Sequence, residues 1–298
     1  MVILKLSNIL WVNIMRKIID GKELSNKILN DISVEVQNLK NEYNTTPGLT
    51  VVLVGDDPAS KTYVKNKERA CKKVGFNSNT IRLSVDTTTE ELLEVIDKLN
   101  KDDNVHGILV QLPLPRHIDQ DLVINAIDFN KDVDGFHLVN IAKLSKGDNG
   151  IVPCTPLGVM ELLKSINCSI EGKNCCVVGR SNIVGKPMVM LLTNANGTVT
   201  VCHSRTKDLK KHTAKADVLV AAIGKANFIT KDMVKKGAVV IDVGINKVDG
   251  KLCGDVNFDD VYSKVKRITP VPGGVGPMTI AMLMKNTLTC YKNYISKR

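Results

Sequence analysis

Aromatic residues, long apolar runs and metal-binding spacings of cysteine or histidine are scarce or absent in this sequence. Aromatics make up 4% of the 298 residues, with a single tryptophan. No apolar run approaches the roughly 20 residues that a membrane-spanning helix requires, so we expect no membrane association. The eight cysteines include no Cys-x-x-Cys pair and the five histidines show no ligand spacing, so no metal site is predicted.

The cysteines also fail to form a disulfide framework. Cys175 and Cys176 are adjacent in an expected buried strand, where their side chains point to opposite faces and cannot share a bridge. We therefore expect free thiols in a reducing cytoplasm. Residues 1–14 lack the basic start and the small-residue cleavage site of a secretion signal, and we interpret them as an N-terminal extension ahead of Met15.

A net charge of +10 is the strongest compositional bias. Nucleic-acid-binding proteins share such a bias, but here the lysines are scattered and no expected helix carries a dense basic stripe. A basic surface also concentrates small anions near a cleft. We therefore expect no nucleic-acid partner and favour an anionic small-molecule substrate.

Short apolar runs alternate with amphipathic segments along most of the chain. Apolar spacings of three and four predict a helix over 20–43, and Thr88 with Glu91 forms a capping box. Thr155 is expected to cap a helix that starts at Pro156. Five further runs are expected to be strands, at 49–54, 80–85, 105–110, 218–223 and 239–243. This alternation predicts an α/β protein with mostly parallel sheets and a long final helix from about residue 278.

Residues 172–275 begin with a strand, a glycine-containing turn, a helix and a second strand, the first half of a dinucleotide-binding unit. Gly179 permits a tight turn, Ser181 is small enough for backbone to approach a pyrophosphate, and Gly185 allows close helix–strand packing. The amino end of the helix supplies free N–H groups for phosphate. Taken alone, this variant motif could also be an ordinary turn that binds nothing.

The second strand of this unit ends in His203-Ser204-Arg205-Thr206, where an NAD-binding protein carries an acid for the ribose hydroxyls. An acid would repel a 2′-phosphate, whereas Ser204 together with Arg180 or Arg205 would bind one. The sequence therefore predicts NADP rather than NAD as the cofactor.

Tyr63 and Lys67 are four residues apart on a helix expected at about 59–74, and so share one face. A lysine beside a phenol suits proton transfer near neutral pH, although a solvated pair is the simpler interpretation of this spacing alone. Short-chain dehydrogenases use the same Tyr-x-x-x-Lys pattern, but their glycine-rich turn precedes the pair. Here the pair comes first, by more than a hundred residues, which excludes that family.

Six motifs occur in order along the chain: Tyr63-Val-Lys-Asn-Lys67, Gln111-Leu-Pro-Leu-Pro115, Lys131-Asp-Val-Asp-Gly-Phe136, Pro153-Cys-Thr-Pro156, Gly179-Arg-Ser-Asn-Ile-Val-Gly185 and Thr269-Pro-Val-Pro-Gly-Gly-Val-Gly-Pro-Met-Thr279. Over residues 15–298 the chain resembles the bifunctional methylenetetrahydrofolate dehydrogenase/methenyltetrahydrofolate cyclohydrolase family of the short bacterial type. The resemblance implies an N-terminal three-layer α/β catalytic domain, residues 15–152, to which a C-terminal helix at 277–298 returns. It also implies a Rossmann-type NADP domain at 153–276.

The resemblance further implies roles for individual residues. Lys67 matches the essential lysine of the cyclohydrolase step, with Tyr63 positioning the folate ring system and Gln111 orienting the lysine. Asp134 matches the aspartate that holds the aminopyrimidine edge of the pterin. Pro272, Gly273 and Gly274 match a loop that closes over the folate. The residues that match cofactor contacts are Gly179, Arg180, Ser181, Gly185, Ser204, Arg205 and Ile245.

The implied reaction is oxidation of 5,10-methylenetetrahydrofolate with NADP, followed by hydrolysis to 10-formyltetrahydrofolate. This chemistry belongs to one-carbon metabolism and purine biosynthesis, and the family expectation is a cytoplasmic homodimer. One open alternative is a scaffold protein that kept the fold and lost the chemistry, against which the presence of Tyr63, Lys67, Gln111 and Asp134 argues. Another is a relative that uses NAD with phosphate and magnesium.

Overall fold

The computed structural model describes residues 17–297, so the extension expected at residues 1–14 and the start expected at Met15 lie outside the described residues. The chain separates into two compact units. A three-stranded unit comprises Ser25–Cys154 and residues 279–297. A five-stranded unit comprises residues 17–24 and Thr155–Met278.

The sheet of the three-stranded unit is parallel, in the order β2-β1-β3. Its strands are β1 (Gly48–Val54), β2 (Asn77–Leu83) and β3 (Gly107–Val110). The central strand β1 is buried along its whole length, as its continuous apolar run predicts. Helix α3 (Pro58–Val74) connects β1 to β2, and helix α4 (Thr89–Lys101) connects β2 to β3, the crossovers that parallel strands require.

Local sequence signals set the boundaries of both crossover helices. Asp57 accepts a hydrogen bond from the backbone N of Ser60 at the start of α3, and Gly75 ends that helix with a left-handed φ of 82°. Thr88 and Glu91 form the predicted capping box at the start of α4. These signals fix which face of α3 each of its side chains occupies.

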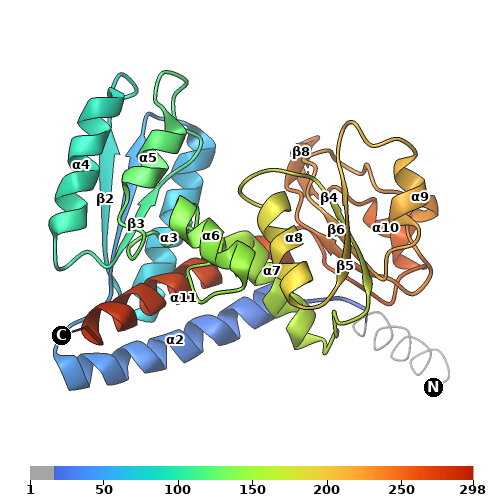
Figure 1. Cartoon of the computed structure of the whole chain (residues 1–298), viewed down its shortest axis with the longest axis horizontal. Helices are drawn as coiled ribbons and strands as arrows, with labels where there is room; N and C mark the ends of the chain where they lie inside the picture. Colours follow the sequence, from blue (N-terminus) through green and yellow to red (C-terminus); the bar gives the residue numbers. More distant parts are fainter. Residues whose placement is uncertain (1–16, 298) are drawn as a thin grey trace. The chain divides into compact units, whose positions relative to one another are not determined.

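Helices cover both faces of this sheet (Figure 1). α4 and α5 (Gln120–Ala126) pack on one face through a buried apolar cluster that includes Val52, Val110, Ile96 and Val123. On the other face, Cys71 of α3 contacts Met284 of the C-terminal helix α11 (Val275–Ile295), with the two sulfur atoms 3.7 Å apart. Helix α2 (Gly21–Tyr43) runs beside α11, where Lys292 Nζ lies 2.7 Å from Glu35 Oε1. The predicted three-layer arrangement with a returning C-terminal helix is confirmed.

The five-stranded unit has a parallel sheet in the order β10-β7-β6-β4-β5. Its strands, in chain order, are β4 (Asn174–Val178), β5 (Thr198–Cys202), β6 (Val218–Ala221), β7 (Val239–Asp242) and β10 (Arg267–Ile268). The chain passes from β4 outward to β5 and then back to β6 on the other side of β4. The carboxyl end of β4 is therefore a topological switch point, which confirms the Rossmann-type arrangement.

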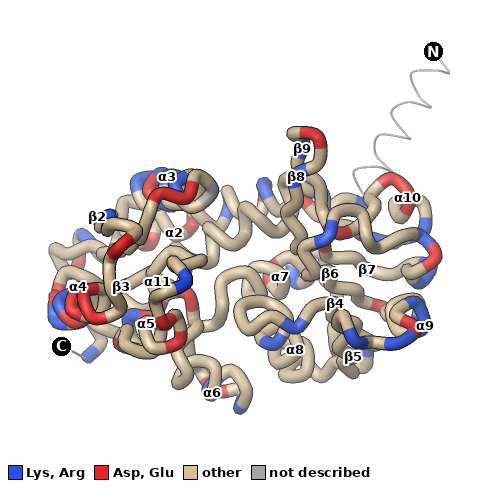
Figure 2. The backbone as a smooth tube through the Cα atoms, turned by 90° about the horizontal axis from the view of Figure 1, so that it is seen from above, with Lys and Arg blue, Asp and Glu red and all other residues tan. Residues whose placement is uncertain are grey.

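Helices also pack on this sheet. Helices α7 (Cys154–Ser165) and α8 (Gly185–Asn194) follow one another along the chain, and α8 packs against β4 and β5. The short elements α9 (Leu209–Thr213), η1 (Lys231–Met233) and α10 (Phe258–Tyr262) adjoin a core cluster that includes Val234 and Val261. The antiparallel hairpin of β8 (Asn246–Val248) and β9 (Lys251–Cys253) stands out from the sheet in Figure 2.

Two helix starts differ from the expectation. α7 begins at Cys154, so Thr155 lies within the first turn and is not the cap. α11 begins at Val275 and includes Pro277 in its first turn. Proline is tolerated there because the first N–H groups of a helix have no partner within the helix. Among residues 17–297, no helix is both long and apolar enough to cross a bilayer.

Candidate active site

Lys67 and Gln111 are in direct contact within the three-stranded unit. Gln111 directly follows β3, and its backbone N donates to Val52 O of the neighbouring strand at 2.8 Å. Lys67, on α3, donates from Nζ to Gln111 Oε1 at 2.9 Å. Gln111 Nε2 donates to Leu112 O at 2.6 Å, which turns the amide oxygen toward the lysine. The geometry thus joins two side chains that lie far apart in the sequence.

Tyr63 lies one turn before Lys67 on α3, and 44% of its surface is exposed. The Lys67–Gln111 contact does not involve its hydroxyl. An exposed aromatic ring beside a polar site is available for stacking by a planar ligand.

Asp134 lies in a turn that is fixed by the buried carboxylate of Asp132. Asp132 is 2% exposed and accepts hydrogen bonds from Gly135 N at 3.0 Å, His137 N at 2.9 Å and Asn140 Nδ2 at 2.9 Å. Sequence reasoning assigned a role to Asp134 and none to Asp132. The available signal was an aspartate three residues before a glycine, a common turn-forming arrangement.

Lys67 and Asp134 influence each other's protonation. Burial raises the pKa of Asp134 to about 6, and the positive charge of Lys67 opposes part of that rise. Burial lowers the pKa of Lys67, and the negative charge of Asp134 opposes part of that fall. Both groups therefore titrate closer to neutral pH than they would in water, a condition that favours acid–base chemistry.

Besides Asp132, two further residues of this site were not predicted, Cys154 and Asn286. Cys154 Sγ lies 3.9 Å from Asp134 Oδ1 and 3.3 Å from Val133 O. Asn286, on α11, donates from Nδ2 to Val133 O and Val152 O, each at 2.9 Å. Burial raises the pKa of the Cys154 thiol well above its usual value, so this cysteine stays protonated. The C-terminal helix thus supports the segment that carries Asp134.

In the five-stranded unit, the glycine-containing turn joins β4 to α8. Gly179 adopts a φ of 133°, and a Cβ there would lie 2.2 Å from Ala222 O. A Cβ on Gly185 would lie 2.4 Å from Gly179 O, so close backbone contacts require both glycines. Ser181 is not only a small residue but also binds backbone N–H groups at the amino end of α8. Its Oγ accepts hydrogen bonds from Val184 N at 3.2 Å and from Gly185 N at 3.3 Å.

The turn after β5 lies beside this glycine turn. β4 and β5 are parallel neighbours, and Gly179 N donates to Cys202 O at 2.8 Å. Arg180, Ser204 and Arg205 are exposed in these two turns, and neither residues 179–184 nor residues 203–206 include an acidic residue. Two guanidinium groups and a hydroxyl at adjacent strand ends are donors that can bind a phosphate group.

A pocket at the carboxyl end of β7 joins residues that the sequence assigned to different ligands. Ile245, predicted to contact the cofactor, lines it together with Pro272, Gly273 and Gly274, predicted to close over folate. Gly273 adopts a φ of 105°, and its carbonyl accepts from Lys22 N at 2.9 Å. The predicted cofactor and folate residues therefore meet within this unit.

The five-stranded unit fits a dinucleotide in its local geometry. Its glycine turn has no room for a Cβ, lies at the switch point of the sheet and is followed by a helix of ten residues. Within residues 17–297, no group of three or more His, Cys, Asp or Glu side chains is placed to hold a metal ion. The glycine turn at the switch point of one unit and the lysine–aspartate site of the other define the class of the protein as a two-domain, dinucleotide-dependent enzyme.

Sequence comparison places this enzyme in a family. The profile of the tetrahydrofolate dehydrogenase/cyclohydrolase catalytic domain matches residues 19–134, and that of the NAD(P)-binding domain of the same family matches residues 153–295. The bifunctional protein FolD of Acetivibrio thermocellus is 57% identical over 277 residues, covering 93% of this chain and 97% of that protein. The chain belongs to the tetrahydrofolate dehydrogenase/cyclohydrolase family, as its motifs predicted.

Solved structures agree with this assignment. The bifunctional FolD methylenetetrahydrofolate dehydrogenase/cyclohydrolase of Campylobacter jejuni superposes with a TM-score of 0.92 at 52% identity, covering 93% of this chain and 98% of that one. The Trypanosoma brucei enzyme, solved with NADP cofactor and inhibitor, gives a TM-score of 0.90 at 39% identity, with coverage of 93% and 98%. The predicted fold is therefore confirmed.

Proposed function

We propose that this protein oxidises 5,10-methylenetetrahydrofolate to the methenyl form with NADP and then hydrolyses the product to 10-formyltetrahydrofolate. The observation that carries the proposal is the contact of Lys67 with Gln111 close to the carboxylate of Asp134. A lysine whose pKa is lowered has a larger neutral fraction than a free lysine and gives up its proton more readily. Membership of a family with an NAD(P)-binding domain supports the oxidation.

For the oxidation, the protein has to position the folate and the cofactor and does not have to provide a strong base. When bound, NADP would supply the acceptor for a hydride from the methylene bridge of the folate. The neighbouring folate nitrogens stabilise the cation that remains, so no side chain has to remove a proton. Gly179, Ser181 and Gly185 would hold the pyrophosphate, and Ile245 would contact the cofactor. The lack of room for a Cβ at both glycines supports this assignment.

The hydrolysis requires proton transfer, for which Lys67 is the proposed group. Water adds to the methenyl carbon, and neutral Lys67 Nζ takes its proton. The charged amine then returns a proton to the departing ring nitrogen. As the carbon–nitrogen bond breaks, the hydroxyl proton of the adduct is released to water and the formyl group forms. Gln111 holds the amine in place through the 2.9 Å contact. The cationic substrate lowers the pKa of Lys67 further by repulsion, which favours the neutral amine at the start of the reaction.

Substrate recognition is proposed for five other positions. The carboxylate of Asp134 would accept two N–H bonds from the aminopyrimidine edge of the pterin, a strong charge-assisted pairing. Tyr63 would stack on the pterin through its exposed ring. Pro272 and Gly273, together with Gly274, would close over the folate.

Preference for NADP over NAD is the finer part of the proposal. Its support is the pair of turns that expose Arg180, Ser204 and Arg205 without an acidic residue. The alternative is NAD with phosphate and magnesium, in which an inorganic phosphate would take the place of the 2′-phosphate. The two modes differ in whether added phosphate is needed for turnover.

We further propose a homodimer in the cytoplasm that supplies formyl groups for purine biosynthesis. The edge strand β5 exposes 39% of Val201, which supports a dimer through the nucleotide domain. All eight cysteines are free thiols, which supports a reducing compartment.

The proposed folate domain comprises residues 15–152 and 277–298, and the proposed NADP domain comprises residues 153–276. Analytical ultracentrifugation tests the dimer: a monomer at micromolar concentration would contradict it.

The test of the proposed function is a spectrophotometric assay with 5,10-methylenetetrahydrofolate, run in parallel with NADP and with NAD. We expect NADP reduction, with the product passing on to 10-formyltetrahydrofolate. Turnover with NAD alone, dependent on phosphate and magnesium, would overturn the cofactor assignment and keep the reaction. A folded protein that binds NADP and turns over neither cofactor would instead be the scaffold alternative.

A further inference from the structure

A fully buried carboxylate, Asp255, holds two loops of the five-stranded unit. Three consecutive backbone N–H groups after β6 donate to it: Ile223 N and Gly224 N reach Oδ2 at 2.6 and 3.0 Å, and Lys225 N reaches Oδ1 at 2.9 Å. Asn246, at the start of β8, donates from Nδ2 to Oδ1 at 3.0 Å. One side chain therefore ties the loop after β6 to the loop after β7.

A second buried carboxylate, Asp242 at the end of β7, fixes the segment that carries Asp255. Asp242 Oδ1 accepts from Gly244 N at 3.0 Å and from Asp255 N at 2.9 Å. Asp242 Oδ2 accepts from Val256 N at 2.9 Å. The two aspartates interlock, because the side chain of one binds the main chain of the other.

Two glycines allow this close approach of carboxylate to backbone. A Cβ on Gly254 would lie 1.8 Å from Asp242 Oδ2, and a Cβ on Gly244 would lie 2.2 Å from Asp255 Oδ1. Any other residue at either position would push a carboxylate away from its N–H partners. The aspartates and glycines therefore form one local structure.

The loops held by Asp255 lie at the cofactor end of the sheet. The loop after β6 begins with Ala222, whose carbonyl oxygen is the atom that a Cβ on Gly179 would strike. The loop after β7 carries Ile245, which lines the pocket at that strand's carboxyl end. In a Rossmann-type sheet, dinucleotides bind at these carboxyl ends.

We propose that Asp255 is a positioning residue for the cofactor, which through backbone hydrogen bonds holds the loops after β6 and β7 in the shape that receives NADP. The inference rests on the proposed use of NADP and assigns Asp255 no contact with it. An asparagine at this position keeps the size of the side chain but offers one acceptor oxygen and an NH₂ group. At least one of the N–H donors then loses its partner and faces another donor.

The test is Asp255→Asn, measured by fluorescence titration with NADPH and by amide hydrogen exchange of the cofactor-free protein. We expect the Kd for NADPH to rise at least tenfold and residues 223–225 to exchange faster. Hydrolysis of methenyltetrahydrofolate supplied directly should stay within twofold, because Lys67 and Gln111, the residues proposed for proton transfer, lie in the other unit. That last readout separates loop positioning from a general loss of structure.

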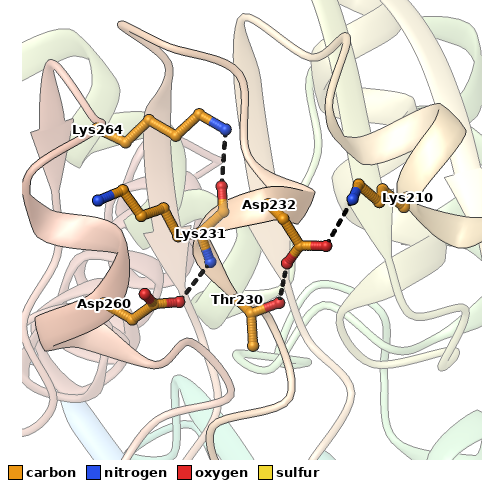
Figure 3. Close-up of polar contacts among 6 residues, drawn as sticks. All are labelled: Lys210, Thr230, Lys231, Asp232, Asp260 and Lys264. Carbon is orange, nitrogen blue, oxygen red and sulfur yellow. Dashed lines mark hydrogen bonds and ion pairs between the residues drawn. The ribbon is translucent and has the colours of Figure 1, made fainter.

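Asp260→Asn is the matched control. Asp260 Oδ2 also accepts a backbone N–H in this unit, from Lys231 at 2.6 Å, but at the exposed η1 turn rather than at the cofactor end (Figure 3). It should leave the Kd for NADPH unchanged. A milder variant, Asn246→Leu, removes a single hydrogen bond to Asp255. It should raise the Kd for NADPH about threefold.

The outcomes separate this inference from the proposed function. Wild-type protein that binds no NADPH would overturn both. Wild-type protein that binds NADPH, with Asp255→Asn binding it equally well, would overturn the inference alone. If Asp255→Asn loses both NADPH binding and the hydrolysis, Asn246→Leu decides: an unchanged Kd for NADPH contradicts the positioning role.

Discussion

Gln111 presents its amide oxygen to Lys67 Nζ at 2.9 Å because its amide nitrogen is already engaged by Leu112 O at 2.6 Å. The glutamine therefore acts as an oriented, neutral acceptor for the lysine. A neutral acceptor holds the amine in position without adding a negative charge that would raise its pKa. The effect of Gln111 on the position of the Lys67 amine can be separated from its effect on the pKa of that amine by changing Gln111 alone.

The variant Gln111→Glu should move the pH profile of the hydrolysis. A carboxylate in contact with Lys67 favours the charged amine, so the pKa of Lys67 rises, by about 1–3 units for a close pair. The hydrolysis needs the neutral amine, so its rise with pH should shift to higher pH, which a stopped-flow pH series measures. An unchanged profile would mean that Lys67 is not the titrating group.

Folate binding should weaken in acid because of Asp134. Burial raises the pKa of this carboxyl to about 6, so it is mostly ionised at pH 7 and gains a proton as the pH falls through 6. A protonated carboxyl accepts the pterin N–H groups poorly, so the KM for folate should rise about tenfold for each pH unit below the pKa. Asp134→Asn should have a high KM that no longer varies over this range. If the wild-type KM is flat from pH 5 to 7, Asp134 does not hold the pterin.

The variant Ser204→Asp should reverse cofactor preference. The new carboxylate would repel a 2′-phosphate, and we expect the KM for NADP to rise at least tenfold, about 1.4 kcal/mol, while NAD use is unchanged or improved. Ser169→Asp adds the same charge at another exposed position of the five-stranded unit and is the control. Equal KM values for NADP in Ser204→Asp and wild type would place the 2′-phosphate elsewhere.

Gly179→Ala should damage both folding and cofactor binding. Its φ of 133° disfavours a side chain, and the new Cβ would lie 2.2 Å from Ala222 O, so we expect a loss of about 2–4 kcal/mol in the free energy of unfolding. Gly237→Ala isolates the backbone effect, because Gly237 has a φ of 80° and no atom within 4 Å of its Cβ position. That control should cost about 1 kcal/mol and leave NADPH binding intact. Urea unfolding measures the free energy of unfolding of the two variants. Equal losses of this free energy in Gly179→Ala and Gly237→Ala would show that the close contact with Ala222 is relieved.

Local signals predicted most of the fold. The capping box at Thr88, the helix-ending Gly75 and the continuous apolar run of β1 each depend on neighbouring residues, and each appears in the structure. Prediction was weaker where a local rule permits two outcomes. The sequence predicted that Pro277 belongs to a rigid segment before the last helix, but a proline fits equally well inside the first turn of a helix.

The candidate site was predictable only in part. Lys67 and Gln111 were identified through ordered motifs, since no spacing rule links a helix residue to the end of a distant strand. Asn286 donates to Val133 O across more than 150 positions of the sequence, and Asp255 reaches Gly224 N across more than 30. Such contacts follow from how the strands and helices pack, and one sequence without its fold contains no local signal for them.

The role of Lys67 in hydrolysis is the central claim, and Lys67→Met tests it most directly. The measurement follows NADP reduction with the methylene substrate and, separately, the decay of methenyltetrahydrofolate supplied directly. Lys65→Met, which removes an exposed lysine from the same helix, is the control. We predict that hydrolysis falls at least about 100-fold, the usual loss on removing a general acid–base group, while oxidation stays within tenfold. Equal loss of both steps, or hydrolysis at the wild-type rate, would contradict the account.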